Sequence, residues 1–490
     1  MLQVFRQSCS KYTLRFILLL FCVVFVRHYE LAQKSFWLDE TFTLLRSTPQ
    51  PFPNFLREVQ FDNHPPLYYF CVMKWRQLWN FQTVLQEDYW IRWLSVLFGL
   101  GAYGLLYWIA KENLTAPELF WALLLFALSP LHIFYAQEAR HYSMSVFLAL
   151  LQHLSFLKLI TRSKSDSLRS VFVWAFLYLS SLTLGFYCFL YLLFVVPGHF
   201  ILMAEKTYRK GQFWTFKEIF GCWILAFVLF LPWFYGVVLE KTQTFGHFQS
   251  SSFIYENHSF ANAFSMLFSG FFFSEFPVYS RTLLIVLFGY GMALILIYLG
   301  WKNRLGFFLI SLFLPFFCLL ILPFKPHQFD PKHLLFATPF AFLLLSKLQS
   351  SVLGRLLLVF VVCLEILGLA EYFHPQSQKE NWKAVAQQVK SVLTSESVVV
   401  VNPVQFIFSL QRYLGVPPYP LTLVGYRGSQ DEIRIASLLK ETSQVIWIQA
   451  ENPVSVPYPI QPALLRPYQE ISSFETHGYF GTIWISVFQK

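Results

Sequence analysis

Charged residues are scarce in this chain. Asp, Glu, Lys and Arg together make up 13% of its 490 residues, whereas soluble globular proteins contain about 25%. Hydrophobic residues make up 56%, and the mean hydropathy is +0.48. This balance argues against a soluble enzyme and predicts an α-helical polytopic membrane protein.

Cysteine pairs and internal repeats are also missing. The seven cysteines include no Cys-x-x-Cys spacing, and their odd number argues against a disulfide framework. Five of them lie in apolar segments, where cysteine behaves as a small apolar residue. No small-residue cleavage site follows the apolar residues 14–26, so we expect this segment to be retained as a first membrane span.

Long apolar segments recur along the chain instead. A helix needs roughly 20 apolar residues to cross the hydrocarbon core of a bilayer. The stretch 171–204 is too long for one crossing, so we divide it near Tyr187. The sequence thus predicts eleven transmembrane helices, at residues 12–30, 90–110, 117–136, 142–160, 171–187, 188–204, 217–238, 283–300, 305–323, 333–347 and 354–372.

The basic residues fall in the short loops between these segments. With a cytoplasmic N-terminus, every short loop on the cytoplasmic side contains Lys or Arg, as the positive-inside rule requires. The net charge of +10 therefore reflects membrane orientation, and we expect no nucleic-acid partner. We expect a multi-pass protein of the plasma (inner) membrane whose C-terminus lies on the extracytoplasmic side.

Three longer segments are then extracytoplasmic: 31–89, 239–282 and 373–490. The last of these is polar and proline-rich. Its patterns predict helices at "KENWKAVAQQVKSVL" and "DEIRIASLLKE", and strands at "SVVVVNP", "QVIWIQA" and "GTIWISVFQ". We therefore predict two domains, a transmembrane catalytic domain at 1–372 and a small α/β domain at 373–490. The small domain shows no catalytic constellation, and both a stabilising cap and an acceptor-recognition role remain open for it.

The first polar cluster is "FWLDETFTLL", just after the first apolar segment. Asp39 and Glu40 follow an aromatic pair there. Asp39 is in a position to cap a short helix that begins near Glu40. The alternative is a general base at the membrane surface.

The second cluster is "FDNHPPLYYF" at residues 61–70. The two prolines fix their own φ angles and bias His64 toward an extended conformation, so a helix is expected to start just after them and to lie along the membrane interface. Asp62 can be a cap for that helix. The clustering of Asp62 and His64 near Asp39 also fits a binding site.

Two further clusters lie on the same predicted side of the membrane. "FYAQEARHYSM" contains Glu138, Arg140 and His141. These residues are either an Arg–Glu ion pair or an anion site, with Glu138 as partner of Arg140 or as a metal ligand. "FKPHQFDPKHLLFATP" contains Lys332 and His333, which suit a lipid phosphate or simple interfacial anchoring.

Carboxylates and cations at one membrane face suit a substrate that carries a phosphate and a hydroxyl to be deprotonated. A polyprenyl-phosphate sugar has these properties, since its tail stays in lipid, its phosphate meets Arg and Lys, and its sugar meets the carboxylates.

The ordered motifs "WLDE", "DNHPPLYY", "IRWLSVLFG" and "LSPLHIFYAQEARHYSM" resemble glycosyltransferase family 39. These are GT-C superfamily membrane enzymes related to protein O-mannosyltransferases and to the lipid A aminoarabinose transferase. The resemblance covers roughly residues 30–345. It implies a GT-C bundle of about eleven transmembrane helices, with interfacial helices in the first outer loop. It also implies inverting sugar transfer from a polyprenyl-phosphate monosaccharide to an acceptor hydroxyl outside the cytoplasm.

The resemblance implies roles for individual residues as well. Asp39 matches the general base and Glu40 its supporting neighbour. Asp62 and His64 match the element that shapes the site, and Arg140 matches a ligand of the donor phosphate. Many relatives have an Arg where this chain has Lys332, before His333, and Lys keeps the charge but loses bidentate geometry.

No defined metal motif is present, although Glu138 and His64 are possible ligands of a divalent metal. The expected partners are the bilayer, the polyprenyl-phosphate sugar donor, and a glycan, lipid or protein acceptor. A transporter or flippase of lipid-linked sugars is the alternative function, and an inactive assembly scaffold is a third. Polar residues gathered at one face favour transfer chemistry over transport, which more often uses inverted repeats and helices broken near mid-membrane.

Overall fold

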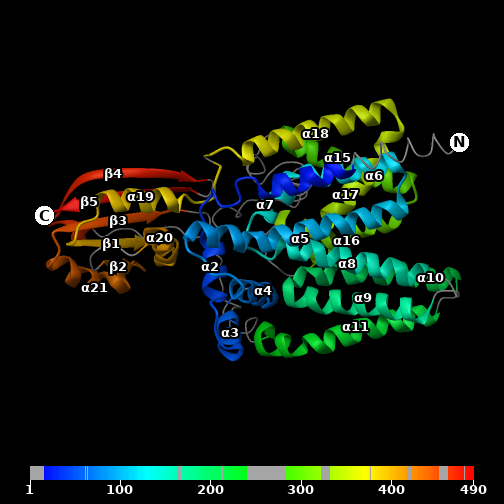
Figure 1. Cartoon of the computed structure of the whole chain (residues 1–490), viewed down its shortest axis with the longest axis horizontal. Helices are drawn as coiled ribbons and strands as arrows, with labels where there is room; N and C mark the ends of the chain where they lie inside the picture. The colour runs from blue at the N-terminus through cyan, green and yellow to red at the C-terminus, as the bar shows by residue number, and fades with distance from the viewer. Residues whose placement is uncertain are drawn as a thin grey trace.

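The computed structural model describes residues 16–490, apart from 61, 63, 163–166, 211–212, 240–282, 322–330, 376, 416–420, 452–461 and 479–480. The chain forms a large helical bundle with a small mixed α/β domain against one end of it (Figure 1). Most of the predicted outer segment 239–282 lies outside the described residues.

All eleven apolar segments contain helix over their described parts. The first is a shorter apolar helix, Phe16–His28. The others are α5 (Val84–Asn113), α6 (Ala116–Leu128), α7 (Pro130–Ala136), α8 (Tyr142–Thr161), α9 (Leu168–Cys188), η1 (Leu190–Phe194), α10 (Val195–Lys210), α11 (Phe213–Trp233), η2 (Phe234–Leu239), α15 (Leu283–Lys302), α16 (Gly306–Ile321), η4 (Pro331–Ala337), α17 (Thr338–Leu345), η5 (Ser346–Ser350) and α18 (Val352–Tyr372).

Among the described residues, six helices are long and apolar enough to cross a membrane, and α6 with α7 makes a seventh if this pair, bent by 53°, is one span. Pro130 causes the bend, because proline cannot donate the backbone hydrogen bond that would continue α6. The predicted crossing at 333–347 is not one helix but three short elements. The segment is apolar because it lies in the interior of the protein, where every residue of α17 is buried. The number of crossings and their orientation stay predictions.

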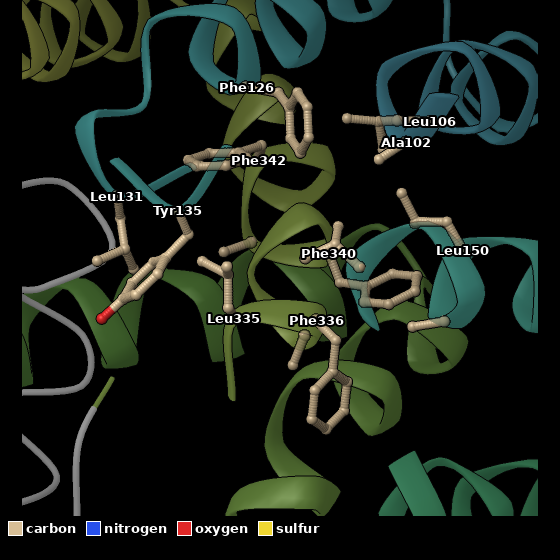
Figure 2. Packing of buried hydrophobic residues seen from close by; sticks show 14 of the residues in the cluster. Ala102, Leu106, Phe126, Leu131, Tyr135, Leu150, Leu335, Phe336, Phe340 and Phe342 are labelled. Carbon is tan, nitrogen blue, oxygen red and sulfur yellow. The ribbon is translucent and has the colours of Figure 1, made fainter. Parts of the chain in front are cut away.

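The centre of the bundle is packed with aromatic and aliphatic side chains around α17. Figure 2 shows Phe340 and Phe342 of α17 among side chains from α5, α6, α7, α8 and η4, with Phe126 and Leu150 close by. Phe340 and Phe342 are fully buried. Dense packing of this kind holds the loops at the end of the bundle in fixed positions.

The first outer loop contains three short helices that lie across the end of the bundle (Figure 1). They are α2 (Leu38–Arg46), α3 (Phe52–Val59) and α4 (Leu67–Arg76). The helix expected after the proline pair is confirmed as α4, whose N-cap is Pro66. Tyr69 and Met73 of α4 pack with Phe55 and Val59 of α3 and with α9 residues.

The C-terminal residues form a five-stranded sheet in the order β2-β1-β3-β5-β4. β1 is parallel to β2 and β3, whereas β5 is antiparallel to β3 and β4. The elements are α19 (Trp382–Val392), β1 (Ser397–Asn402), η6 (Val404–Phe406), α20 (Ile407–Leu414), β2 (Thr422–Gly425), α21 (Ser429–Lys440), β3 (Gln444–Ala450), α22 (Pro462–Leu465), β4 (Gln469–Gly478) and β5 (Gly481–Gln489). The expected strands β1, β3 and β5 and the expected helices α19 and α21 are confirmed. The 373 boundary between domains stays a prediction.

A buried ionic network joins this sheet domain to the bundle. Asp88, at the start of α5, is fully buried. It accepts hydrogen bonds from Arg412 Nε at 2.9 Å and Nη2 at 2.5 Å, and from the Tyr413 hydroxyl at 2.9 Å. Arg412 also donates to Glu87 at 3.0 Å. This ion pair holds α20 against α5, because separating the two helices would leave the buried charges of Asp88 and Arg412 unpaired.

We predict that Arg412→Ala lowers the free energy of unfolding by about 3 kcal/mol, because Asp88 would lose its strongest buried partner. Thermal unfolding of the purified protein in detergent checks this. Arg427→Ala is the matched control, since Arg427 is 57% exposed in its pair with Asp431 and such pairs contribute about 0–1 kcal/mol. Equal midpoints for the two variants would contradict the prediction.

Candidate functional site

The position of α2 depends on a buried ion pair between Glu40 and Arg92 of α5. Arg92 donates to both carboxylate oxygens of Glu40, at 2.8 Å and 2.7 Å. Glu40 Oε1 also accepts the backbone N–H of Ala139 at 2.8 Å. The Glu40 side chain is 1% exposed, so it serves to hold α2 against α5 and against the turn at 137–141.

The remaining donors of Arg92 hold the chain that leads into α2. Its Nη atoms donate to the carbonyl oxygens of Leu31, Lys34 and Ser35 at 2.9–3.1 Å. All five N–H groups of this guanidinium can thus be satisfied by fixed acceptors. Arg92 was missed as a functional residue, although a charge near the end of an apolar segment is a recognisable signal.

Asp39 points the other way and stays accessible. Its side chain is 33% exposed, and its Oδ2 lies 3.4 Å from Arg140 Nη2. Of the two alternatives for Asp39, the capping role is wrong, because the N-cap of α2 is Trp37 and Asp39 lies in the first turn. A carboxylate there benefits from the unpaired N–H groups at a helix N-terminus.

Arg140 contacts α2, α4 and the segment before α4 that contains His64. Its Nη1 lies 3.3 Å from the Asp39 carbonyl oxygen and 3.2 Å from the Tyr69 hydroxyl, and its Nη2 lies 3.3 Å from His64 Nδ1. The side chain is 4% exposed. Its Nε is buried without a hydrogen-bond partner among the described residues. Arg140 therefore has donor capacity left for an anion.

Asp62 and His64 form a tight local turn beside Arg140. Asp62 Oδ1 accepts the backbone N–H of His64 at 3.0 Å and the Tyr69 hydroxyl at 2.9 Å. Asp62 does not cap α4, because the cap residue there is Pro66. Burial would raise the pKa of Asp62, but the hydrogen bonds from His64 and the charge of Arg140 hold that pKa below its ordinary value.

The two histidines of the motifs face each other. The ring centroids of His64 and His141 are 4.5 Å apart. Burial, with the charge of Arg140, lowers the pKa of His64. Burial lowers the pKa of His141 further, with contributions from His64, Arg140, His333 and Lys332. Both rings are therefore neutral near pH 7, and Nδ1 of His64 can either donate to Asp62 at 3.2 Å or accept from Arg140.

Lys332 and His333, on η4, complete the same region. The His333 ring lies 5.1 Å from the ring of Tyr191 in η1, and both Lys332 and His333 act on the pKa of His141. The structure thus brings Asp39, Asp62, His64, Arg140, His141, Lys332 and His333 together from four separate segments. Their roles in binding stay predictions.

Glu138 lies apart from this group. Its Oε1 pairs with Lys379 Nζ, from the C-terminal region, at 2.7 Å, and not with Arg140. It lines a polar cavity of about 30 Å³ with Lys34 and Tyr372, large enough for one or two waters. Burial, with the charges of Arg92 and Lys379, lowers the pKa of Lys34 to about 7, although Glu30 and Glu138 act in the opposite direction.

The possible metal ligands do not meet. The described residues contain no group of three or more His, Cys, Asp or Glu side chains able to hold a metal ion. Glu138 pairs with Lys379, whereas His64 contacts Asp62 and Arg140. These residues do not fit a metal centre, so no chemical step is assigned to one.

The C-terminal domain also holds α2, which the sequence did not reveal. Glu380 Oε2 accepts the backbone N–H of Leu38 at 3.1 Å, and the Tyr413 hydroxyl accepts that of Phe36 at 2.6 Å. The Ser409 hydroxyl donates to Thr41 Oγ1 at 3.2 Å. Trp37 and Leu38 are buried in the same apolar cluster as α19 and the sheet. The bundle and the C-terminal domain therefore both hold α2 and so fix the position of the partly exposed Asp39 carboxylate.

Comparison with known proteins identifies the fold. No protein-family model and no curated protein matches the sequence. Among solved structures, ArnT from Cupriavidus metallidurans in the apo state is similar over 98% of both chains, with a TM-score of 0.54 and 13% identity.

A second similar structure is the archaeal oligosaccharyltransferase AglB from Archaeoglobus fulgidus, in complex with an inhibitory peptide and a dolichol-phosphate. It is similar over 90% of this chain and 69% of its own, with a TM-score of 0.50 and 10% identity. The same archaeal enzyme tethered with an acceptor peptide gives a TM-score of 0.50 at 9% identity, over 89% of this chain and 68% of its own. At these identities the likeness establishes the fold alone. The chain has the GT-C fold that these proteins share.

We predict that the folded protein loses stability as the pH falls below about 6.5, because the unfolded chain takes up protons on His64 and His141 while burial prevents this in the folded state. Thermal unfolding midpoints at about pH 7.5 and about pH 5.5 measure the effect. His141→Phe should reduce the drop. His477→Phe removes a histidine that is 69% exposed and should leave the drop unchanged. A midpoint for the unmodified protein that does not fall would contradict the prediction.

Proposed function

We propose that this protein is a membrane glycosyltransferase. It moves a sugar from a polyprenyl-phosphate-linked monosaccharide to an acceptor hydroxyl on the extracytoplasmic side of the inner membrane, with inversion at the anomeric carbon. The GT-C fold supports the proposal. Two of the similar structures are of an archaeal oligosaccharyltransferase, one in complex with a dolichol-phosphate and one tethered with an acceptor peptide. They are consistent with a lipid-linked donor here.

The observation that carries the proposal is the pairing of one accessible carboxylate with one buried cation. Asp39 is partly exposed, and Arg140, at 3.4 Å, is almost fully buried. A general base must reach a hydroxyl from solvent, whereas a phosphate ligand gains strength from a site with little water. Asp39 meets the first requirement, and Arg140 beside it meets the second.

The reaction follows from these positions. Asp39 takes the proton of the acceptor hydroxyl as its oxygen attacks the anomeric carbon. The bond from that carbon to the phosphate oxygen breaks on the opposite face, so the configuration inverts. The electron pair leaves with the polyprenyl phosphate, and Arg140 and Lys332 offset the negative charge that develops on it.

The neighbouring residues support these two groups. Tyr69 and His64 contact Arg140 and fix the direction of its guanidinium. Asp62 holds both of them through its carboxylate. Glu40 contacts Arg92, and we assign it the support of α2. Of the two adjacent acids Asp39 and Glu40, we therefore assign a chemical step to Asp39 alone.

Transport of a lipid-linked sugar is the alternative, and product formation separates it from transfer. We would incubate purified protein in nanodiscs with radiolabelled polyprenyl-phosphate sugars and a membrane-lipid extract. Label in a new product supports transfer. Label that crosses the membrane of sealed vesicles on an unchanged lipid supports transport instead.

We predict that Asp39→Asn lowers the transfer rate by at least about 100-fold, because an amide cannot accept the hydroxyl proton. The thermal unfolding midpoint should stay within a few degrees, since the Asp39 side chain is partly exposed. Glu58→Gln is the matched control, because Glu58 is an exposed carboxylate on α3, and it should transfer normally. Near-normal turnover by Asp39→Asn would refute the general-base role.

We predict that Arg140→Ala weakens binding of a polyprenyl phosphate by about tenfold or more, since charge-assisted hydrogen bonds contribute about 1.5–3 kcal/mol. Arg140→Lys should restore part of the affinity through its charge. Arg57→Ala, which removes an exposed cation on α3, should not change it. Binding is measured directly in detergent with the short-chain lipid phosphate, and unchanged affinity of Arg140→Ala would remove Arg140 from the phosphate site.

A further inference from the structure

One face of the C-terminal sheet carries an unused arrangement of aromatic and polar side chains. The sheet has α19 packed with the residues of its other face, including Ile483, Ile485 and Val487. Because side chains alternate along a strand, the residues between these point to the opposite face. Residues of this face line a hollow of about 600 Å³ over β3, β4 and β5. The sheet itself lies at one end of the molecule, beside the helical bundle (Figure 1).

The strand register places these residues in ordered rows across the sheet. Gln449, Trp484 and Glu475 form one row. Trp447, Ser486 and Ser473 form the next. Each row therefore combines an indole ring with hydrogen-bonding side chains on neighbouring strands, about 5 Å apart. Phe488 and Glu470 continue the pattern at the far end.

Trp447 borders the hollow on the side that packs against α21. It is 2% exposed, lines the hollow and lies in one apolar cluster with Tyr426 and with Ile435 and Leu439 of α21. Trp484 of β5 is only partly buried. Its indole ring is therefore the more accessible of the two to a ligand in the hollow.

The charge of the lining limits the kind of ligand. Glu470 and Glu475 are its only charged residues, and the described lining includes no Lys or Arg. Glu475 has one exposed partner, His477, at 3.3 Å. Such a surface repels phosphates and acidic sugars, but its carboxylates and amide accept hydrogen bonds from hydroxyl groups.

We propose that this hollow is a binding site for a neutral oligosaccharide. A pyranose ring has apolar C–H groups on its faces and hydroxyl groups around its rim. Trp484 offers an indole ring on which such a face can pack, while Gln449 and Glu475 lie on either side to meet the hydroxyls. The volume is within the range of known ligand sites. The site is separate from Asp39 and does not depend on the proposed transfer reaction.

The test uses the full-length protein in detergent on an array of immobilised neutral and sulfated glycans, with no lipid donor present. We expect binding to neutral glycans only. Solution titration of a neutral glycan that binds should give a dissociation constant below about 1 mM. Trp484→Ala should weaken this binding by about tenfold, since an aromatic contact contributes on that scale.

Two further variants keep the result interpretable. Glu475→Ala changes an exposed side chain, so it should weaken binding without affecting folding. Phe408→Ala removes an aromatic ring that is 42% exposed on α20, outside the hollow, and should bind normally. Asp39→Asn protein should bind the neutral glycan as tightly as the unmodified protein does, because the hollow is separate from the reaction site.

Three outcomes would overturn the proposal. One is the absence of binding to any neutral glycan. Another is neutral-glycan binding that neither Trp484→Ala nor Glu475→Ala weakens. The third is stronger binding of an extended peptide than of any neutral glycan, which would show that β4, the edge strand of the sheet in the described part of the chain, recruits a strand. Loss of transfer activity in Asp39→Asn tests the glycosyltransferase proposal separately, so failure of one proposal leaves the other standing.

Discussion

The arrangement of the candidate site depends on the buried ion pair between Arg92 and Glu40. One guanidinium holds the start of α2, the chain at 31–35 and, through Glu40, the turn at 137–141. Buried ion pairs contribute little net stability, because desolvation offsets much of the attraction. They do specify one geometry, since any shift of α2 would leave a charge unpaired. The result is a fixed helix N-terminus that presents Asp39.

This constraint explains why two adjacent acids have different roles. Residues that follow each other in a helix point about 100° apart. When Glu40 turns inward to Arg92, Asp39 must turn toward Arg140 and the open side. The same division applies at the turn, where Arg140 faces the site while Glu138 faces Lys379. Neighbouring charged residues therefore have different roles: those on the inner side of the element support the site, and those on the other side face it.

The C-terminal domain belongs to the support of the site. It contacts α2 through Glu380, Tyr413 and Ser409, and it is joined to α5 through Asp88 and Arg412. This fits the stabilising role considered for the domain. Its sheet has a second face away from these contacts, so the same domain can support the reaction site and bind a ligand elsewhere.

The sequence by itself determined the local features. The length of the apolar segments located the helices of the bundle, the proline pair set the start of α4, and β-branched runs marked β1, β3 and β5. The strands β2 and β4 were missed because one is four residues long and the other is largely exposed. The grouping of the polar motifs at one end of the bundle followed from counting the apolar segments between them.

Only the tertiary structure decided which charged residues pair. Hydropathy and spacing report on neighbours within one element, whereas Arg92 meets Glu40, and Lys379 meets Glu138, across elements far apart in the chain. Those contacts depend on how the helices pack and on where the C-terminal domain lies. For this reason the sequence could name Asp39 and Arg140 as candidates, but only the fold showed that they lie together, with Glu40 buried and Glu138 elsewhere.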